Sequence, residues 1–377
     1  MRIAIFNNYP LERVLDEVRL KESPDHLLFG LNFLQSAGHK CEVIKENQST
    51  LPLFVMLKVI FPFVHWGDLK KQSFLYKNKK NYDLIYSCCG NMTNALQFLK
   101  SFKKFNLPII NIQHHPVIPG RIDFLRHYFE KRICNYADQI LCLSQNVKKS
   151  IEKKYESVHN ICSIQWGPDI KFYPKTISPG KGLVVAGRTS RDFSTVINSI
   201  NQTDLNATII YLENQLGYDH YVHSNIKLIS AKNEQPVPGV TSKGWIKQCD
   251  LNYYYQNARV IGIPTTKQNT LVGLTSLLDC IGIGKPVIMT KNPNIDIDIE
   301  KEGIGHWVKP GDSKRWRNLI KWYDENPDRA LQMGMKARYL GQRKYNSEVF
   351  SQKLLNILID EVSKVTNKID CRKLSKK

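Results

Sequence analysis

Short apolar runs alternate with amphipathic stretches twice along this chain of 377 residues, and this alternation constrains the fold more than any other feature. Apolar runs of about four to eight residues are typical of buried strands, and an apolar face repeating every 3.6 residues is typical of a helix. The first set has strands at 1–6, 41–44, 82–87, 107–113 and 137–144 with helices at 25–37, 94–105 and 124–136; the second has strands at 182–187, 207–213, 226–230, 260–264 and 305–310 with helices at 192–201 and 248–257. Strands that alternate with helices predict an α/β fold with doubly wound parallel sheets.

A segment rich in proline, glycine and polar residues, 166–182, separates the two sets. A chain of this length exceeds one ordinary core, so two domains are expected. We predict a Rossmann-like, acceptor-binding domain at 1–175, a second Rossmann-like domain at 176–342, and at 343–377 a C-terminal helix that packs back on the first domain, followed by a basic tail. Ligands bind beyond the carboxyl ends of such strands, so a cleft between two facing sheets is the expected active site.

The chain is strongly basic, with 54 Lys and Arg against 34 Asp and Glu, a formal net charge of +20. Anionic lipid, phosphorylated substrates and nucleic acid are the partners that this charge favours, although part of it lies in a solvated C-terminal tail. No nucleic-acid-binding module is recognised, so no nucleic-acid partner is expected. The nine cysteines include no CxxC pair and the N-terminus shows no signal peptide, which indicates a cytoplasmic protein.

The apolar stretch 51–64, LPLFVMLKVIFPFV, is followed by five lysines between positions 70 and 80. It is too short to span a bilayer. Two interpretations stay open: an element lying on an anionic membrane surface, or a core segment followed by a solvated basic loop. The first predicts peripheral attachment at the inner face of the membrane.

The stretch 264–290, PTTKQNTLVGLTSLLDCIGIGKPVIMT, predicts a polar loop, a helix and a buried strand. Its apolar residues from Leu271 to Ile281 repeat at helical spacing, and Gly282 and Gly284 end the helix. A polar loop leading into a helix offers free backbone N–H groups and the positive end of the helix dipole. Both features suit a phosphate group.

Seven segments, in order along nearly the whole chain, resemble the retaining GT-B glycosyltransferases of family four. They are SAGHKCEVI (36–44), ADQILCLSQNVKKSI (137–151), GPDIKFYP (167–174), VVAGRTSRD (184–192), GWIKQCDLNYYYQNARVIGIP (244–264), DCIGIGKPVIMT (279–290) and HWVKPGD (306–312). The resemblance implies two Rossmann-like domains facing across a cleft. It also implies sugar transfer from a nucleotide-diphosphate donor to an acceptor hydroxyl, with retention and without a metal ion or other cofactor.

Carried over by position, several residues of the C-terminal half would bind the donor. Gly187 would let the backbone approach the diphosphate, and Arg188 would neutralise the leaving phosphate, with Arg191 in place of the family's nearby lysine. Asp279 matches the second acid of the family's paired-glutamate motif, which accepts hydrogen bonds from ribose hydroxyls. From the residues alone, a surface arginine at 188 and a helix-surface acid at 279 are the alternatives.

The same region departs from the family. The first acid of the pair would fall at Leu271 and is absent, and Gly273 is one place off the expected glycine. Gln268, Asn269 and Thr270 are candidates for replacement polar contacts with the donor sugar. The missing acid motivates a second hypothesis, a catalytically silent GT-B module that binds a nucleotide or a glycan.

Two histidines, His114 and His115, end a strand of the N-terminal half, and Asn8 follows its first strand. The family has a histidine here that contacts the transferred sugar, and Pro116 favours His114 as its counterpart, with His115 and Asn8 on the acceptor side. A hydrogen bond within the loop is the alternative for either histidine. Segment 295–300, IDIDIE, contains a DxD pattern, but its alternation indicates a half-exposed segment and no metal site is predicted.

The predicted function is therefore hexosyl transfer from a nucleotide sugar to a glycan or a lipid-linked acceptor. The resemblance points to polysaccharide or glycolipid biosynthesis, with a bacterial surface polysaccharide as its product.

Overall fold

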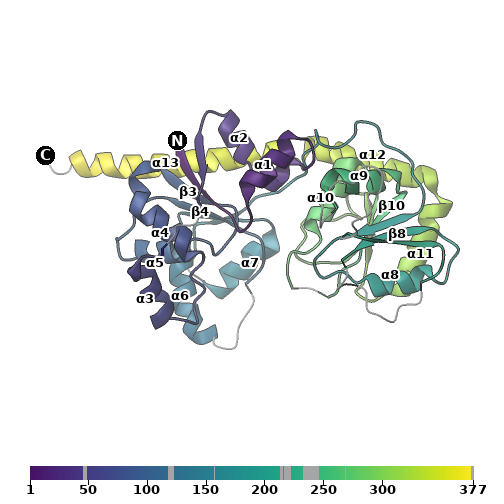
Figure 1. The fold of residues 1–377 in the computed structure, drawn as a ribbon, viewed down its shortest axis with the longest axis horizontal. Helices are drawn as coiled ribbons and strands as arrows, with labels where there is room; N and C mark the ends of the chain where they lie inside the picture. Colours follow the sequence, from purple (N-terminus) through teal and green to yellow (C-terminus); the bar gives the residue numbers. More distant parts are fainter. Residues whose placement is uncertain are drawn as a thin grey trace. The chain divides into compact units, whose positions relative to one another are not determined.

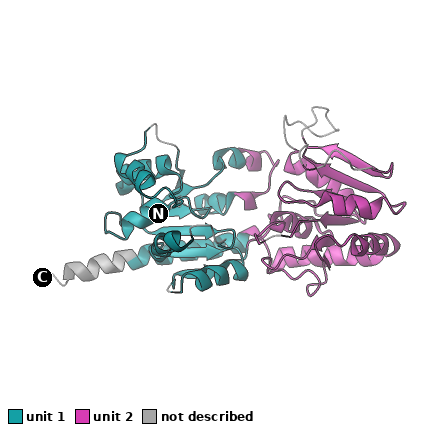
Figure 2. Ribbon diagram, turned by 90° about the horizontal axis from the view of Figure 1, so that it is seen from below, with its two compact units in different colours: residues 1–15, 28–165, 348–377 teal, residues 16–27, 166–347 magenta. Residues whose placement is uncertain are grey.

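The computed structural model describes residues 1–45, 49–117, 123–156, 158–212, 215, 222–231, 246–267 and 269–374, with side chains up to residue 364. The chain divides into two compact units, which Figure 2 shows in two colours. Unit 1 comprises residues 1–15, 28–165 and 348–377, and unit 2 comprises residues 16–27 and 166–347.

Unit 1 is built on a parallel six-stranded sheet in the order β2-β1-β3-β4-β5-β6. Its strands are β1 (Arg2–Phe6), β2 (Lys40–Val43), β3 (Leu84–Ser87), β4 (Ile109–Gln113), β5 (Gln139–Cys142) and β6 (Ile161–Ser163). The central strands are apolar at successive positions because helices cover both faces of a parallel sheet. β3, for example, is buried at every residue.

The helices of unit 1 surround this sheet (Figure 1). They are α1 (Leu11–Arg19, which crosses into unit 2), α2 (Leu31–Ser36), α3 (Pro52–Ile60), α4 (Leu69–Asn78), α5 (Asn94–Lys100), α6 (Asp123–Asn135), α7 (Gln145–Lys154) and α13 (Ser347–Leu374), with short 3₁₀ turns η1 (Asp25–Leu28) and η2 (Lys79–Asn81). Phe54 of α3, Leu75 of α4, Phe98 of α5 and Ile133 of α6 share one core with the sheet residue Phe6. These four helices therefore cover the same face.

Unit 2 repeats the architecture with a parallel sheet in the order β12-β11-β10-β7-β8-β9. Its strands are β7 (Leu183–Ala186), β8 (Ala207–Tyr211), β9 (Ile226–Ser230), β10 (Val260–Ile263), β11 (Val287–Thr290) and β12 (Gly305–Val308), and its helices are α8 (Phe193–Ile200), α9 (Gln248–Asn257), α10 (Leu274–Ile283), α11 (Ser313–Glu325) and α12 (Pro327–Arg343). Phe193 of α8 and Trp316 of α11 pack with Val185 and Ile209 of the sheet. The two sheets confirm the predicted doubly wound α/β class.

The structure corrects one predicted element and one of the two interpretations left open for the lysine-rich segment. The helix predicted at 25–37 is interrupted, because Phe29 (φ +49°) and Gly30 (φ +85°) adopt left-handed backbone between η1 and α2. The lysine-rich segment after residue 68 is a helix, α4, rather than a solvated loop. Asp68 caps it by accepting from the backbone N–H groups of Lys70 (3.1 Å) and Lys71 (3.0 Å).

The final helix, α13, belongs to unit 1 from residue 348 onward. Its Leu354 lies against Gly30, where an added Cβ would stand 3.0 Å from Leu354 Cδ2. Within the described ranges, the structure has no helix that is both long enough and apolar enough to cross a membrane.

Candidate functional site

The strand order of unit 2 reverses at β7, since β8 and β9 lie on one side of it and β10, β11 and β12 lie on the other. The crevice outside the carboxyl ends of β7 and β10 is therefore the topological switch point, where ligands of such sheets bind. The loops after these two strands, 187–192 and 264–273, carry six predicted donor-binding residues. These are Gly187, Arg188, Arg191, Asn269, Thr270 and Gly273.

Backbone hydrogen bonds join the two switch-point loops. Asp192 N–H donates to Pro264 O (3.2 Å) and Thr266 N–H donates to Ser190 O (3.1 Å), which makes a short antiparallel bridge between Arg191 and Thr265. These backbone hydrogen bonds fix the two loops relative to each other without any contribution from a ligand.

The side chain of Arg191 links the loop after β7 to helix α10. Its Nε donates to Ala186 O (3.1 Å), one terminal nitrogen to Thr189 O (3.1 Å) and the other to Ser276 Oγ (2.8 Å). Burial lowers the pKa of the guanidinium. Gly187 makes room for it: at φ +137°, a Cβ there would stand 2.2 Å from Arg191 Nε. The direct diphosphate contact predicted for Arg191 stays a prediction.

Arg188 differs from Arg191 in exposure, because its side chain is exposed at the carboxyl end of β7. Its backbone carbonyl accepts a hydrogen bond from the Gln215 amide, which fixes the course of the loop. Of the two arginines in this loop, Arg188 is therefore the one whose side chain is exposed to solvent.

The N-terminus of α10 follows the loop after β10, at the same switch point, and has no capping side chain. Its N-cap is Gly273 in the left-handed conformation (φ +90°), and glycine offers no side-chain oxygen to the first-turn N–H groups. Asn292 fixes the preceding loop, donating from Nδ2 to Thr270 O (2.9 Å) and Val272 O (3.1 Å). The first turn of α10 therefore keeps the polarity that favours an anion.

The side chains predicted to contact the donor sugar lie unevenly in this loop. Asn269 is exposed and Thr270 is half-buried, whereas Leu271 is 8% exposed and belongs to the core. The place where the family has an acid is therefore filled by a core leucine. Gln268 lies outside the described residues.

Asp279 is an interior residue, 3% exposed, rather than an acid on the helix surface. Its Oδ1 accepts a hydrogen bond of 2.6 Å from the Tyr173 hydroxyl, and burial raises the pKa of the carboxyl to about 7. Gly282 makes room for the tyrosine, since a Cβ there would stand 2.2 Å from Tyr173 Cε2. The ribose contact predicted for Asp279 stays a prediction, and Tyr173 covers the carboxyl in this structure.

Unit 1 has its own switch point between β1 and β3. Asn8, predicted on the acceptor side, is exposed after β1, and its neighbour Asn7 is 2% exposed. The carbonyl oxygen of Asn7 accepts from Lys71 Nζ (3.2 Å), which ties α4 to this edge. The sequence offers no sign of which of two adjacent asparagines points inward.

His114 lies at the same edge, and its Nε2 is 2.7 Å from the carbonyl oxygen of Cys88. A carbonyl only accepts, so Nε2 carries the proton and Nδ1 keeps its lone pair. Burial lowers the pKa of His114 to about 4, so the ring is neutral near pH 7. His115 is exposed, and its carbonyl accepts from Gln113 Nε2 (3.0 Å), which fixes the turn that carries both histidines.

The fold can now be compared with known structures. No family model matches the chain, and no curated protein matches it in sequence. A glycosyltransferase from Rickettsia africae aligns over 96% of this chain and 98% of its own (TM-score 0.66, 13% identity). Sucrose-phosphate synthase from Thermosynechococcus elongatus aligns over 96% and 98% (0.64, 15%), and Anabaena HepE in complex with UDP-glucose over 96% and 100% (0.63, 14%).

The chain has the GT-B glycosyltransferase fold. At these identities the likeness shows the fold alone, so the roles predicted for individual residues rest on the geometry described above.

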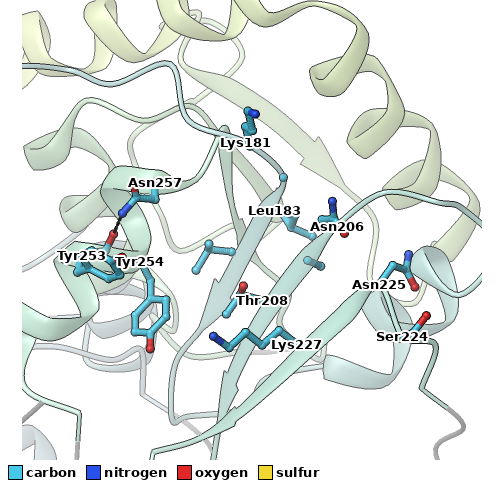
Figure 3. A pocket seen from close by; sticks show the side chains of 13 residues that line it. Lys181, Leu183, Asn206, Thr208, Ser224, Asn225, Lys227, Tyr253, Tyr254 and Asn257 are labelled. Atoms are coloured by element: carbon cyan, nitrogen blue, oxygen red, sulfur yellow. Dashed lines mark hydrogen bonds between the residues drawn. The ribbon is translucent and has the colours of Figure 1, made fainter. Parts of the chain in front are cut away.

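A hollow of about 310 Å³ lies at the opposite edge of the unit 2 sheet (Figure 3). Residues at the amino ends of β7, β8 and β9 line it together with Tyr253, Tyr254 and Asn257 from the end of α9. None of the predicted site residues lines this hollow. It is therefore separate from the switch-point crevice.

The DxD pattern lies in a segment that alternates as predicted. Ile295, Ile297 and Ile299 are buried, and the acids between them are exposed. Asp298 accepts from Trp307 Nε1 (3.0 Å), which gives it a structural partner. Among the residues that the structure describes, no three His, Cys, Asp or Glu side chains gather as a metal site would require.

Proposed function

We propose that this protein is a glycosyltransferase that moves a sugar from a nucleotide-diphosphate donor to an acceptor hydroxyl. The observation that carries the proposal is the uncapped N-terminus of α10 at the switch point of unit 2, with the exposed Arg188 on the neighbouring loop. A helix N-terminus and an arginine together suit a diphosphate. The fold supports it too, since Anabaena HepE, which shares it, is described in complex with UDP and with UDP-glucose.

In the proposed mechanism the diphosphate leaves toward α10. Backbone N–H groups of the first turn and the Arg188 guanidinium stabilise the charge that develops on the departing phosphate oxygen. That oxygen takes the proton of the acceptor hydroxyl on the same face of the sugar, which gives retention without a metal ion. Arg191 and Ser276 hold the loop and the helix in place, so their contribution is positional.

His114 is proposed to contact the transferred sugar. As a neutral ring with Nε2–H directed at Cys88 O, it offers Nδ1 as an acceptor for a sugar hydroxyl. A neutral acceptor orients a hydroxyl without attracting the diphosphate, which a charged imidazolium would do.

The finer assignments follow the resemblance. The transferred group is a hexose, the acceptor is a glycan or a lipid-linked glycan in polysaccharide or glycolipid synthesis, and the protein works at the cytoplasmic side of a membrane. The basic composition supports an anionic surface as a partner.

A second candidate function is a catalytically silent module that binds a nucleotide or a glycan. The observation that favours it is Leu271, which fills with a buried apolar side chain the place where the family has an acid. Binding without turnover would be the outcome of losing that contact while keeping the diphosphate site.

The test is to record ligand-observed NMR with a panel of UDP-, GDP- and ADP-sugars, and then to assay transfer and donor hydrolysis with the sugar that binds. Arg188→Ala should lower kcat/KM at least about a hundredfold, because it removes charge stabilisation made in the transition state. Lys175→Ala, which removes an exposed cation outside the two switch-point loops, is the control. Wild-type turnover by Arg188→Ala refutes the mechanism, and donor binding with neither transfer nor hydrolysis favours the silent module.

A further inference from the structure

The helix α3 is apolar on the side that faces solvent as well as on the side that faces the core. Phe54 and Leu57 are buried, whereas Val55, Met56, Val59 and Ile60 are 45%, 49%, 72% and 52% exposed. Lys58 is the one polar side chain of the helix. A helix on a globular surface normally turns a polar face outward, and one that is apolar all round is normally enclosed. The exposed apolar side chains of α3 therefore indicate that this face binds an apolar partner.

The helix α6 presents a second apolar strip with the same spacing. Phe124, Leu125 and Tyr128 are 77%, 44% and 61% exposed. Phe61, directly after α3, packs on Phe129 of α6 with ring centroids 4.6 Å apart, so the two helices adjoin (Figure 1). We name the seven exposed side chains the α3/α6 face: Val55, Met56, Val59, Ile60, Phe124, Leu125 and Tyr128.

This face gathers nearly half of the exposed large apolar side chains in the described part of the chain, seven of fifteen. Scattered exposed apolar residues need no explanation, but a contiguous patch marks an interaction surface. The two apolar strips of the α3/α6 face lie on helices that adjoin through Phe61 and Phe129, so we infer that they form one such surface.

The charge around the face has one sign. Segment 49–80, which includes α3 and α4, has six lysines and one acid, Asp68. In α6 the acids Asp123 and Glu130 both pair with Lys154, at 2.7 and 3.2 Å, and Glu130 also pairs with Arg126 at 2.6 Å. The acids near the face are thus neutralised locally, and the lysines of segment 49–80 give the surroundings a net positive charge.

We propose that the α3/α6 face docks on an anionic lipid bilayer, with its apolar side chains at the level of the acyl-chain boundary and the lysines among the headgroups. An apolar strip flanked by lysines is the pattern of an interfacial helix, and each lysine adds attraction to anionic lipid. A second copy of the chain fits the face less well, because pairing two copies would bring two positive segments together.

This inference deepens the proposed function, because docking on a bilayer would bring the protein to a lipid-linked acceptor. Only this connection to the acceptor rests on the proposed glycosyl transfer. The docking itself requires neither donor nor turnover, so it is measured without them.

The experiment is flotation of the full chain with vesicles of phosphatidylcholine alone and with vesicles that also contain phosphatidylglycerol. The wild type should bind the anionic vesicles and lose binding as salt rises. The double variant Val59→Glu/Phe124→Glu should bind at least about tenfold more weakly, since it replaces two of the most exposed apolar contacts with anions. Lys58→Gln/Lys77→Gln should weaken binding about fivefold per lysine.

The matched control is Leu20→Glu/Met335→Glu, which makes the same change at side chains 69% and 55% exposed in unit 2. It should bind like the wild type, and circular dichroism should show both double variants folded. Arg188→Ala should also bind vesicles normally, so failure of the proposed function and failure of docking are separate results.

Three results would overturn the docking proposal. The first is that the wild type does not bind anionic vesicles. The second is that both glutamate double variants weaken vesicle binding equally. The third is that the wild type does not bind vesicles but forms a concentration-dependent dimer that Val59→Glu/Phe124→Glu abolishes. The last would assign the face to a second copy.

Discussion

Replacing Asp279 by asparagine should stabilise the protein at alkaline pH and leave its stability nearly independent of pH at this site. Burial raises the pKa of this carboxyl from 3.8 to about 7 in the fold. The folded state therefore holds a proton that the unfolded state releases. For an acid whose pKa is raised, the stability contribution is complete below about pH 4 and falls as pH rises through 7.

The size of the effect follows from the shift. About three units at about 1.4 kcal/mol each give about 4 kcal/mol lost by the wild type between pH 4 and pH 8. Asp279→Asn keeps an oxygen that can accept from the Tyr173 hydroxyl and carries no titratable proton. The difference in unfolding free energy between the variant and the wild type should therefore rise by about 4 kcal/mol over this range, whatever its starting value.

The measurement is urea unfolding of both proteins at a series of pH values, compared as a difference so that all other titrating groups cancel. Tyr173→Phe is the companion variant. It removes the hydrogen bond that stabilises the ionised carboxylate, so its stability should fall more steeply with pH than that of the wild type. Parallel pH curves for the wild type and Asp279→Asn would refute the reasoning.

Three further predictions concern the same region and unit 1. Gly282→Ala should cost about 1–3 kcal/mol of unfolding free energy, because its Cβ would overlap the Tyr173 ring, and a variant as stable as the wild type would show that the ring moves freely. Ser276→Ala should cost about 1–3 kcal/mol and weaken nucleotide binding, since it leaves an Arg191 nitrogen without its acceptor; the exposed neighbour Thr275→Ala is the control, and equal effects of the two would contradict the bracing role. The ratio of kcat/KM between the wild type and His114→Asn should stay constant from pH 5 to 8, because the folded pKa is about 4, and a step near pH 6.5 would show that the histidine titrates in that range.

Most strands and helices follow from the sequence because their apolar periodicity is local, although the three-residue strand β6 (Ile161–Ser163) was not predicted. The run Leu84–Ser87 is buried throughout because parallel strands are covered on both faces, and this produces a continuous apolar stretch that can be recognised without the fold. The interruption at Phe29 and Gly30 could not be predicted, since the segment keeps a helical apolar pattern on either side of it. Helix α4 was obscured by its lysines, which resemble a solvated loop until Asp68 is recognised as its N-cap.

The proximity of the two switch-point loops was predictable from the sequence, whereas the contacts of their side chains were not. Glycines and polar residues after β7 and β10 mark the switch point, and the structure brings these loops together. The partners of the two buried polar groups are remote in sequence, however: Ser276 is 85 residues from Arg191, and Asp279 is 106 residues from Tyr173. The sequence motif alone does not show that a charged residue is already hydrogen-bonded to a protein group far away in the chain.

These two buried contacts act on the same helix. Ser276 and Asp279 are one turn apart near the start of α10, so Arg191 holds that turn from the β7 loop while Tyr173 holds it from the segment that precedes β7. Both contacts occupy polar atoms of these side chains, because the guanidinium donates to three protein oxygens and the carboxyl accepts from the Tyr173 hydroxyl. In the proposed mechanism a diphosphate is attracted by Arg188 and by the backbone N–H groups after Gly273, and the buried pairs position those groups. Substitutions at the buried pairs should therefore change nucleotide affinity through the position of α10, whereas substitution at Arg188 should change the rate.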